Sequence, residues 1–204
     1  IALENSRVIC REILHPVSHF ENSDGEIIYD FGQNFAGVVE LDIRGEAGQE
    51  ILVRHAEVLE GDRLYTASLR TAKAEVHYIC KEGAQTYSPR LTYMGFRYIA
   101  VTGIAPEKLV VRARVLSSDF EESGDFSCSN ALLNRLLSNF VDIPTDCPQR
   151  DERQGWTGDI AVFAPTACYN FNLSRFYEKW LKDMRLEQSH GGGIPTVIPI
   201  QGCS

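Results

Sequence analysis

The chain has 204 residues, of which 28 are acidic and 20 basic, so its formal net charge is −8 at neutral pH. This negative surplus argues against nucleic acid or an anionic membrane as a partner and is compatible with a neutral glycan. A hydrophobic content of 44% can build a core, no apolar run approaches a membrane span, and the first residues do not resemble a signal peptide.

Residues 1 to about 117 have the pattern of short β-strands. In residues 37–43, Val39, Leu41 and Ile43 alternate with Glu40 and Asp42, which gives the strand one dry and one wet face. Glycine-containing turn signals separate most of the β-rich segments, and regular short strands predict a jelly-roll-like β-sandwich. The expected strands are 26–31, 37–43, 50–59, 74–80, 96–102 and 109–116.

This half of the chain also supports a second interpretation, a carbohydrate-binding module without catalysis of its own. Aromatic residues in strands are mostly core, however, so we expect most of its tyrosines to be buried. His55 and Glu57 share one strand face, but two ligands without a third are weak evidence for a metal, and a cross-strand hydrogen bond is favoured. We therefore predict no metal site and no cofactor. The tyrosines concerned are Tyr65, Tyr87, Tyr93 and Tyr98.

A polar run over residues 117–125 ends the strand pattern and predicts a domain boundary. We expect a β-sandwich module over 1–120 and a helical region over 121–204. The first helix follows Ser129 or Asn130, either of which can cap it, and carries leucines at helical spacing.

Two further helices and an extended segment are expected near the end of the chain. The first spans 159–171 and contains Pro165, which favours a bend. The second runs from Ser174 to about Ser189 and buries a stripe that includes Trp180 and Leu181. Three glycines end that helix, and the proline-rich residues 194–199 must then run extended.

Residues 144–159 hold the densest cluster of charge in the chain. Prolines and glycines within them cannot sustain a helix or strand, so the stretch predicts a loop. A merely solvated loop rarely includes a tryptophan, and loops fixed on a rigid scaffold commonly carry catalytic groups. The charged residues are Asp146, Arg150, Asp151, Glu152, Arg153 and Asp159, and Trp156 lies among them.

This mixture suits acid catalysis on a sugar, in which one protonated carboxyl donates to the leaving oxygen of a glycosidic bond. If Glu152 shares a pocket with Asp146 and Asp159, their negative charges raise its pKa, as a general acid near neutrality requires. Arg150 can keep neighbouring aspartates charged through forked hydrogen bonds. Trp156 offers an apolar face to the C–H side of a sugar ring.

The run Asp-Cys-Pro-Gln-Arg-Asp-Glu-Arg at 146–153, followed by Gly-Trp-Thr-Gly-Asp at 155–159, closely resembles the signature of bacterial α-L-rhamnosidases, glycoside hydrolase family 78. The resemblance implies that Glu152 is the general acid. It also implies that a further set of residues lines the rhamnose subsite. These are Asp146, Arg150, Trp156 and Asp159.

The resemblance extends to the first half of the chain. Residues 30–34, 55–59 and 95–98 are similar to motifs of the β-sandwich module that precedes the family's catalytic (α/α)6 barrel. It therefore implies a sandwich followed by the opening helices of that barrel. Because the family hydrolyses with inversion, its general base is a downstream Glu that we expect outside this chain. We expect the chain, which starts at Ile1, to be a piece of a longer enzyme and inactive alone.

Six cysteines are scattered without a Cys-x-x-Cys pair or a Cys/His cluster, so we predict buried thiols rather than a disulfide scaffold or a zinc site. This pattern slightly favours a reducing compartment such as the cytoplasm. A Cys147 nucleophile, with His190 downstream, is disfavoured because nothing beside the cysteine looks like a base. The six are Cys10, Cys80, Cys128, Cys147, Cys168 and Cys203.

Together these features predict a fragment of an inverting α-L-rhamnosidase that acts on rhamnose-containing glycosides or glycans, with no nucleic acid or membrane partner. They leave homo-oligomerisation open. A carbohydrate-binding fragment would be distinguished by sugar binding that survives loss of Glu152. A purely structural β module would bind no sugar, and a hydrolase of the same barrel class acting on another glycan would share the acid.

Overall fold

The computed structural model describes residues 7–124, 127–138, 150 and 155–198. The described chain forms two compact units. One contains residues 10–116 and Arg150, and the other contains the first described residues together with everything from residue 117 onward apart from Arg150. Within the described residues, no helix has both the length and the apolar character needed to cross a membrane.

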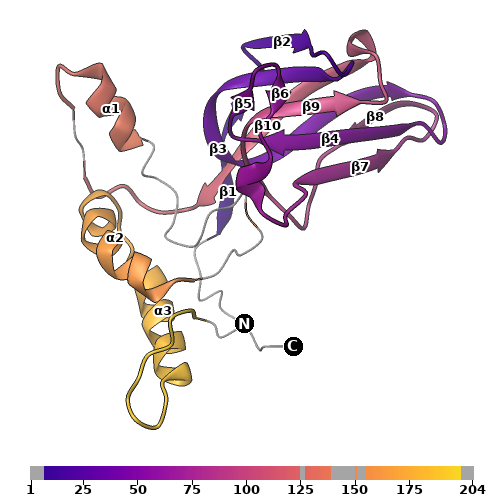
Figure 1. Cartoon of the computed structure of the whole chain (residues 1–204). Helices are drawn as coiled ribbons and strands as arrows, with labels where there is room; N and C mark the ends of the chain where they lie inside the picture. The colour runs from indigo at the N-terminus through magenta and orange to yellow at the C-terminus, as the bar shows by residue number, and fades with distance from the viewer. Residues whose placement is uncertain (1–6, 125–126, 139–149, 151–154, 199–204) are drawn as a thin grey trace. The chain divides into compact units, whose positions relative to one another are not determined.

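Ten strands, two short 3-10 helices and three α-helices make up the described elements (Figure 1). The strands are β1 (Val8–Leu14), β2 (Ser18–Glu21), β3 (Ile27–Gly45), β4 (Glu50–Ala56), β5 (Leu59–Glu60), β6 (Arg63–Leu64), β7 (Glu75–Ile79), β8 (Gly83–Tyr87), β9 (Met94–Thr102) and β10 (Leu109–Ser118). The helices are η1 (Ala67–Leu69), η2 (Pro106–Lys108), α1 (Ala131–Ser138), α2 (Thr157–Asn170) and α3 (Ser174–Glu187).

The sheet is organised around β3, a strand of 19 residues that takes part in two layers. Its first residues, 27–30, lie between β2 and β9, and β9 continues the layer to β4 and β7. Near its other end, residues 41–43 lie between β8 and β10, and β1 follows β10. All the registered pairings are antiparallel. The predicted β-sandwich is therefore confirmed, with one strand shared by both sheets.

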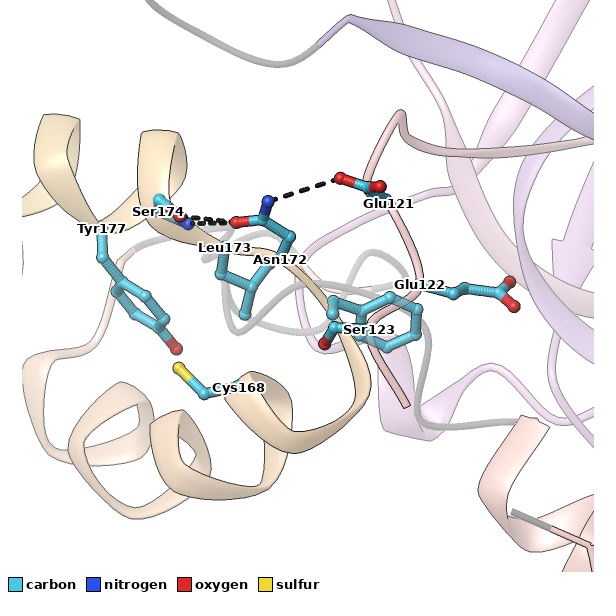
Figure 2. Close-up of a pocket in the computed structure, with 9 residues that line it drawn as sticks. Glu121, Glu122, Ser123, Cys168, Asn172, Leu173, Ser174 and Tyr177 are labelled. Atoms are coloured by element: carbon cyan, nitrogen blue, oxygen red, sulfur yellow. Dashed lines mark hydrogen bonds between the residues drawn. The ribbon is translucent and has the colours of Figure 1, made fainter. Parts of the chain in front are cut away.

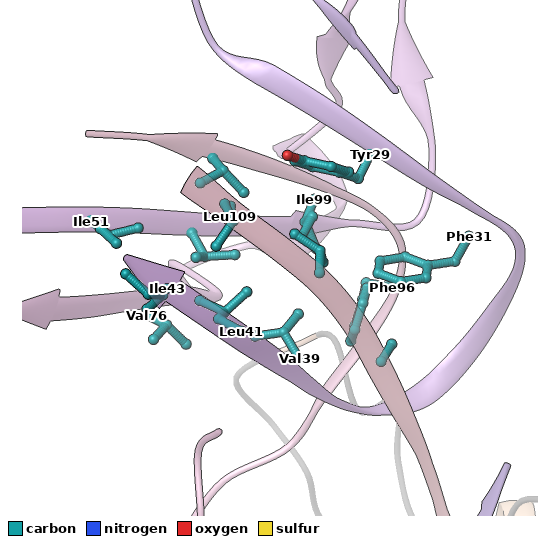
Figure 3. Close-up of a cluster of buried hydrophobic side chains, with 14 of the residues drawn as sticks. Tyr29, Phe31, Val39, Leu41, Ile43, Ile51, Val76, Phe96, Ile99 and Leu109 are labelled. Atoms are coloured by element: carbon teal, nitrogen blue, oxygen red, sulfur yellow. The ribbon is translucent and has the colours of Figure 1, made fainter. Parts of the chain in front are cut away.

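Side chains from both layers form one buried cluster between them. Figure 3 shows Tyr29 and Phe31, from the first half of β3, in the same cluster as Val39, Leu41 and Ile43 from its second half. These five side chains are at most 6% exposed, and the cluster is completed by Phe35 of β3, by Cys80 after β7, and by residues of β4, β7, β9 and β10. Burial of this apolar surface is the main favourable term that holds the layers together.

The bend in β3 occurs where its register with β9 shifts, between Asp30 and Phe35. Gly32 supplies the positive φ of +79° that this irregularity needs. The Asp30 carboxylate accepts a hydrogen bond from the Gly32 N–H (2.7 Å) and two more from the Arg97 guanidinium (both 2.8 Å). The Arg97 contact holds the pKa of the Asp30 carboxyl below its usual value, against the opposing effect of partial burial.

The helices form as expected, with small differences at their ends. Asn130, one of the two predicted caps, accepts hydrogen bonds from the second and third N–H groups of α1. Helix α2 begins at Thr157, two residues earlier than predicted, and contains Pro165. Helices α2 and α3 share a buried cluster that includes Ala167 and, partly buried, Phe176.

Several detailed expectations were wrong. Strands predicted over 26–31 and 37–43 are one strand, because the bulge at Gly32 bends the chain without ending it. Strands β1, β2 and β8 were missed; β2 is exposed at all four positions, and β8 buries Gln85 rather than an apolar residue. Leu181 was placed in the buried stripe of α3, but it is 60% exposed.

The expectation that the cysteines are buried holds for Cys80 and fails for Cys168, which is exposed. Cys10 and Cys128 are partly buried, while Cys147 and Cys203 lie outside the described residues. Two tyrosines predicted as core, Tyr65 and Tyr93, are each 36% exposed, whereas Tyr87 and Tyr98 pack against buried clusters.

His55 lies in the centre of the sandwich and is 1% exposed. Its Nδ1 is 2.8 Å from the carbonyl oxygen of Ala74, and its ring packs edge-on against Phe96. Burial lowers the pKa of His55 from the ordinary 6.5 to about 4, although the hydrogen bond to Ala74 acts in the opposite direction. The folded protein therefore holds this imidazole neutral.

The neutral burial of His55 predicts a pH-dependent stability. The unfolded chain takes up a proton below about pH 6.5 and the folded chain does not until about pH 4, so the unfolding free energy falls as pH drops through that window. The expected loss is about 3 kcal/mol, measured by urea unfolding at a series of pH values. His55→Asn, which keeps a donor for Ala74, should flatten this slope.

His15→Asn is the matched control, because His15 is exposed between β1 and β2. This variant should keep the wild-type dependence of stability on pH. The same slope in wild type and His55→Asn would show that other groups cause the acid sensitivity.

Candidate active site

The end of the charged loop, Gly155 to Thr157, runs antiparallel to residues 195–198. Trp156 and Val197 form an antiparallel bridge. On either side of it the Ile198 N–H donates to the Gly155 carbonyl (2.9 Å), and the Thr157 N–H donates to the Thr196 carbonyl (2.9 Å). The extended segment expected after the glycines is therefore present, and it is paired with the predicted catalytic loop.

The Thr157 side chain adds to this backbone pairing. Its hydroxyl lies 3.0 Å from the Pro195 carbonyl oxygen and 3.1 Å from that of Thr196, so it donates to this pair of acceptors. Although Thr157 is the first residue of α2, its hydroxyl serves the neighbouring segment rather than the helix end. This role could not be predicted from the sequence, because threonine is common at helix starts for capping alone.

Gly155 lies against the side of α3. A Cβ at this position would be 2.3 Å from the Ile198 carbonyl oxygen and 2.5 Å from the Trp180 ring, distances that real Cβ atoms essentially never show. Trp180 is 7% exposed and Ile198 is 0% exposed, and they form a buried cluster with Ile160 of α2. Trp180 is thus core, as predicted, and its bulk requires glycine at position 155.

Two of the predicted sugar-binding residues lie at the start of α2. Trp156 is the residue immediately before the helix, has an extended backbone, and is partly buried. Asp159 is exposed in the first turn, where the positive end of the helix dipole favours a carboxylate. The fold therefore brings these two residues to one helix end, next to the anchored loop.

The other predicted site residues are less fully described. Arg150 is partly buried, and its Nε has no hydrogen-bond partner among the residues that the structure describes. Asp146, Cys147 and Glu152 lie outside the described residues, as does the rest of the loop between Arg150 and Gly155. Their predicted roles stay predictions.

The three sandwich motifs that resemble the family meet at one corner of the sandwich. Asp30 is paired with Arg97, whose guanidinium also lies 4.9 Å from the centre of the Tyr98 ring. Asn34 donates a 2.6 Å hydrogen bond to Glu57. The motifs thus brace the bend of β3, which accounts for their polar residues without a catalytic role.

His55 and Glu57 do not share a ligand site. His55 bonds to the backbone next to β7, in agreement with the predicted cross-strand hydrogen bond, while Glu57 lies beyond the end of β4 and bonds to Asn34. Among the described residues, no group of three or more His, Cys, Asp or Glu side chains is arranged to hold a metal ion.

A cavity of about 560 Å³ lies in the helical unit, between the polar segment 121–123 and the junction of α2 with α3. Figure 2 shows Asn172 hydrogen-bonded to Glu121 and to Ser174, with the Tyr177 hydroxyl beside Cys168. Burial raises the pKa of the Tyr177 hydroxyl, and the neighbouring Cys168 adds to this effect.

The cavity offers hydroxyl, amide and carboxylate groups together with an aromatic wall. None of the described loop residues Arg150, Trp156 and Asp159 lines it. The sequence predicted that Glu121 and Glu122 belong to a polar linker. A polar, charged segment has the same composition whether it is a linker or lines a cavity, so the cavity could not be predicted. The candidate active site is therefore the anchored loop end and not this cavity.

Two protein-family models match the chain. Residues 20–117 match the bacterial alpha-L-rhamnosidase concanavalin-like domain, and residues 121–203 match the bacterial alpha-L-rhamnosidase 6 hairpin glycosidase domain. The first match covers the sandwich strands from β2 to β10, and the second covers all three α-helices.

Individual relatives agree with the family models. The chain is 44% identical over 194 residues to an alpha-L-rhamnosidase of Streptomyces avermitilis, a match that covers 89% of this chain and 19% of that protein. It is 41% identical over 186 residues to an alpha-L-rhamnosidase of Formosa agariphila, covering 84% of this chain and 20% of that protein. The chain thus spans about a fifth of the length of these relatives.

Solved structures give the same result. The alpha-L-rhamnosidase of Streptomyces avermitilis, determined in complex with L-rhamnose, superposes with a TM-score of 0.92 at 40% identity, over 99% of this chain and 21% of that one. The alpha-L-rhamnosidase of Dictyoglumus thermophilum gives a TM-score of 0.88 at 38% identity, over 96% of this chain and 24% of that one.

Proposed function

This chain belongs to the bacterial α-L-rhamnosidase family, and we propose that the complete protein removes terminal α-L-rhamnose from glycosides or polysaccharides. The observation that carries the proposal is the loop signature at 146–159, which leads into α2 within the region matched by the family's six-hairpin glycosidase domain. A relative of the same fold is known in complex with L-rhamnose, which supports the choice of sugar.

We assign Glu152 as the general acid that protonates the leaving glycosidic oxygen. Rhamnose is held by hydroxyl contacts to the carboxylates and by contact with the Trp156 ring. The half-buried Trp156 and the exposed Asp159 support this assignment, since both keep surface that a ligand can reach. The rhamnose subsite then consists of Asp146, Arg150, Trp156 and Asp159.

We propose an inverting mechanism, in which a second carboxylate, about 6.5 to 9.5 Å from the acid, activates water. Three acids of α3 follow Asp159 in the described chain: Glu178, Asp183 and Glu187. Asp183 is paired with Lys179 one turn away, Glu178 is exposed, and Glu187 is the last residue of the helix. These positions suit a solvated surface, so we assign the general base to a residue outside positions 1–204.

We propose the domain boundary between residues 120 and 121, four residues after the point at which the two compact units divide. The two family matches meet near this point, at 117 and 121. The segment after it also pairs with the junction of α2 and α3, because the Asn172 N–H donates to the Glu121 carbonyl and the Ser123 N–H donates to the Asn170 carbonyl. The polar run thus supports a sandwich module over 1–120 and the start of the helical barrel over 121–204.

The assignment of Glu152 predicts a leaving-group dependence. In the complete enzyme, Glu152→Gln should lower kcat by about 10² to 10⁴ on rhamnosides with poor leaving groups, which need the proton. The loss on an activated nitrophenyl rhamnoside should be much smaller. Steady-state kinetics on both kinds of substrate measures the difference.

Glu178→Gln is the matched control, because Glu178 is exposed on α3. It should leave both rates unchanged. An equal loss on both substrates for Glu152→Gln would argue for a binding role instead, and rhamnose binding with no hydrolysis by the wild-type protein would favour the carbohydrate-binding alternative.

The assignment of the subsite predicts weaker product binding. Asp146→Asn and Asp159→Asn each remove a charge-assisted hydrogen bond to a sugar hydroxyl, so the inhibition constant of L-rhamnose should rise about 10- to 100-fold. Asp183→Asn, at the residue paired with Lys179 on α3, should leave the constant unchanged. Unchanged inhibition in either test variant would remove that aspartate from the subsite.

A further inference from the structure

We propose that Thr157 is a positioning residue for Trp156, and that it acts by locking the end of the catalytic loop onto residues 195–198. The inference rests on the proposed function, since it concerns the rhamnose subsite to which Trp156 is assigned. It adds a role for the extended segment and for a hydroxyl that is not itself assigned a contact with the sugar.

The first argument is the continuity of the pairing around Trp156. Hydrogen bonds flank this residue on both sides, from Ile198 to Gly155 and from Thr157 to Thr196, each 2.9 Å long. The backbone of Trp156 is therefore held from both neighbours. Fixing the backbone of one residue costs about 1–2 kcal/mol of conformational entropy, and here the fold has met that cost before any sugar binds.

The second argument is that the partner segment is itself immobilised. Ile198 is fully buried against Trp180 and Ile160, so α2, α3 and the extended segment share one cluster. Gly155 fits against Trp180 without room for a methyl group. The loop end therefore packs against a close-packed surface of low compressibility. A hydrogen bond to this surface fixes the position of the loop end.

The third argument is that the Thr157 hydroxyl is the one side-chain hydrogen bond described between Gly155–Thr157 and this segment. It reaches the Thr196 carbonyl, which also accepts the Thr157 N–H, and the Pro195 carbonyl, which lies one residue beyond that last backbone bond. Removal of the hydroxyl leaves the backbone bonds in place but removes the side-chain contacts to Pro195 and Thr196 that reinforce the last backbone bond, next to Trp156. Thr157 is thus a point where positioning can be changed without changing any group assigned to touch the sugar.

The test compares Thr157→Val, which keeps the shape and removes the hydroxyl, with Thr157→Ser, which keeps the hydroxyl. On an activated nitrophenyl rhamnoside, the complete enzyme with Thr157→Val should show a KM and a rhamnose inhibition constant raised about 5- to 10-fold. Its kcat should stay within about 2-fold of wild type, because Thr157 is assigned no contact with the reacting atoms and this substrate needs little help from the acid. Thr157→Ser should restore both constants to within about 2-fold.

The split between KM and kcat separates positioning from simple loss of structure. A variant that is partly unfolded has fewer active sites, which lowers the apparent kcat and leaves KM unchanged. Thr166→Val, at an exposed threonine on α2, is the matched control and should behave as wild type.

Unchanged constants in Thr157→Val, a fall in kcat alone, or failure of Thr157→Ser to restore binding would each overturn this inference while leaving the proposed function intact. A wild-type enzyme that neither binds L-rhamnose nor cleaves the rhamnoside would instead overturn the proposed function, and the inference with it.

Discussion

The helical unit depends on the close approach between Gly155 and Trp180. Because position 155 carries no side chain, the loop backbone lies close enough for the Gly155 carbonyl to accept a hydrogen bond from the Ile198 N–H, which closes the antiparallel pairing before α2. Ile160, Trp180 and Ile198 are buried by the same approach. The loop signature thus combines charged residues, to which we assign the sugar contacts, with a glycine and a threonine whose described contacts fix the end of the loop.

In the sandwich, a bent strand is fixed by side-chain hydrogen bonds. One strand, β3, serves both layers, and its bend is held by the Asp30 carboxylate through Gly32 and Arg97. The polar residues that form these contacts therefore have a structural role. A carboxylate in a family-like motif is therefore not by itself a candidate for catalysis, whereas Asp159, exposed at a helix start beside the anchored loop, keeps the surface that a ligand needs.

The sequence predicted the architecture well because its signals are local: alternation in β3, the Asn130 cap of α1, and the amphipathic pattern of α3. Prediction from the sequence failed for elements whose exposure or pairing depends on residues far away in the chain. The exposed β2 and the polar Gln85 of β8 carry no apolar alternation, and Leu181 has helical spacing but faces solvent. The charged loop was recognisable from composition and family resemblance, but its anchoring to residues 195–198 was not, since hydrogen bonds between backbone groups leave no trace in residue types.

The most direct test of the central claim is the hydrolysis of a panel of nitrophenyl glycosides by the complete enzyme, with the anomer of the released sugar followed by proton NMR. The account predicts strong preference for the α-L-rhamnoside and release of β-L-rhamnose as the first product, because an inverting enzyme delivers water to the face opposite the leaving group. Preference for another glycoside, or α-L-rhamnose as the first product, would contradict it.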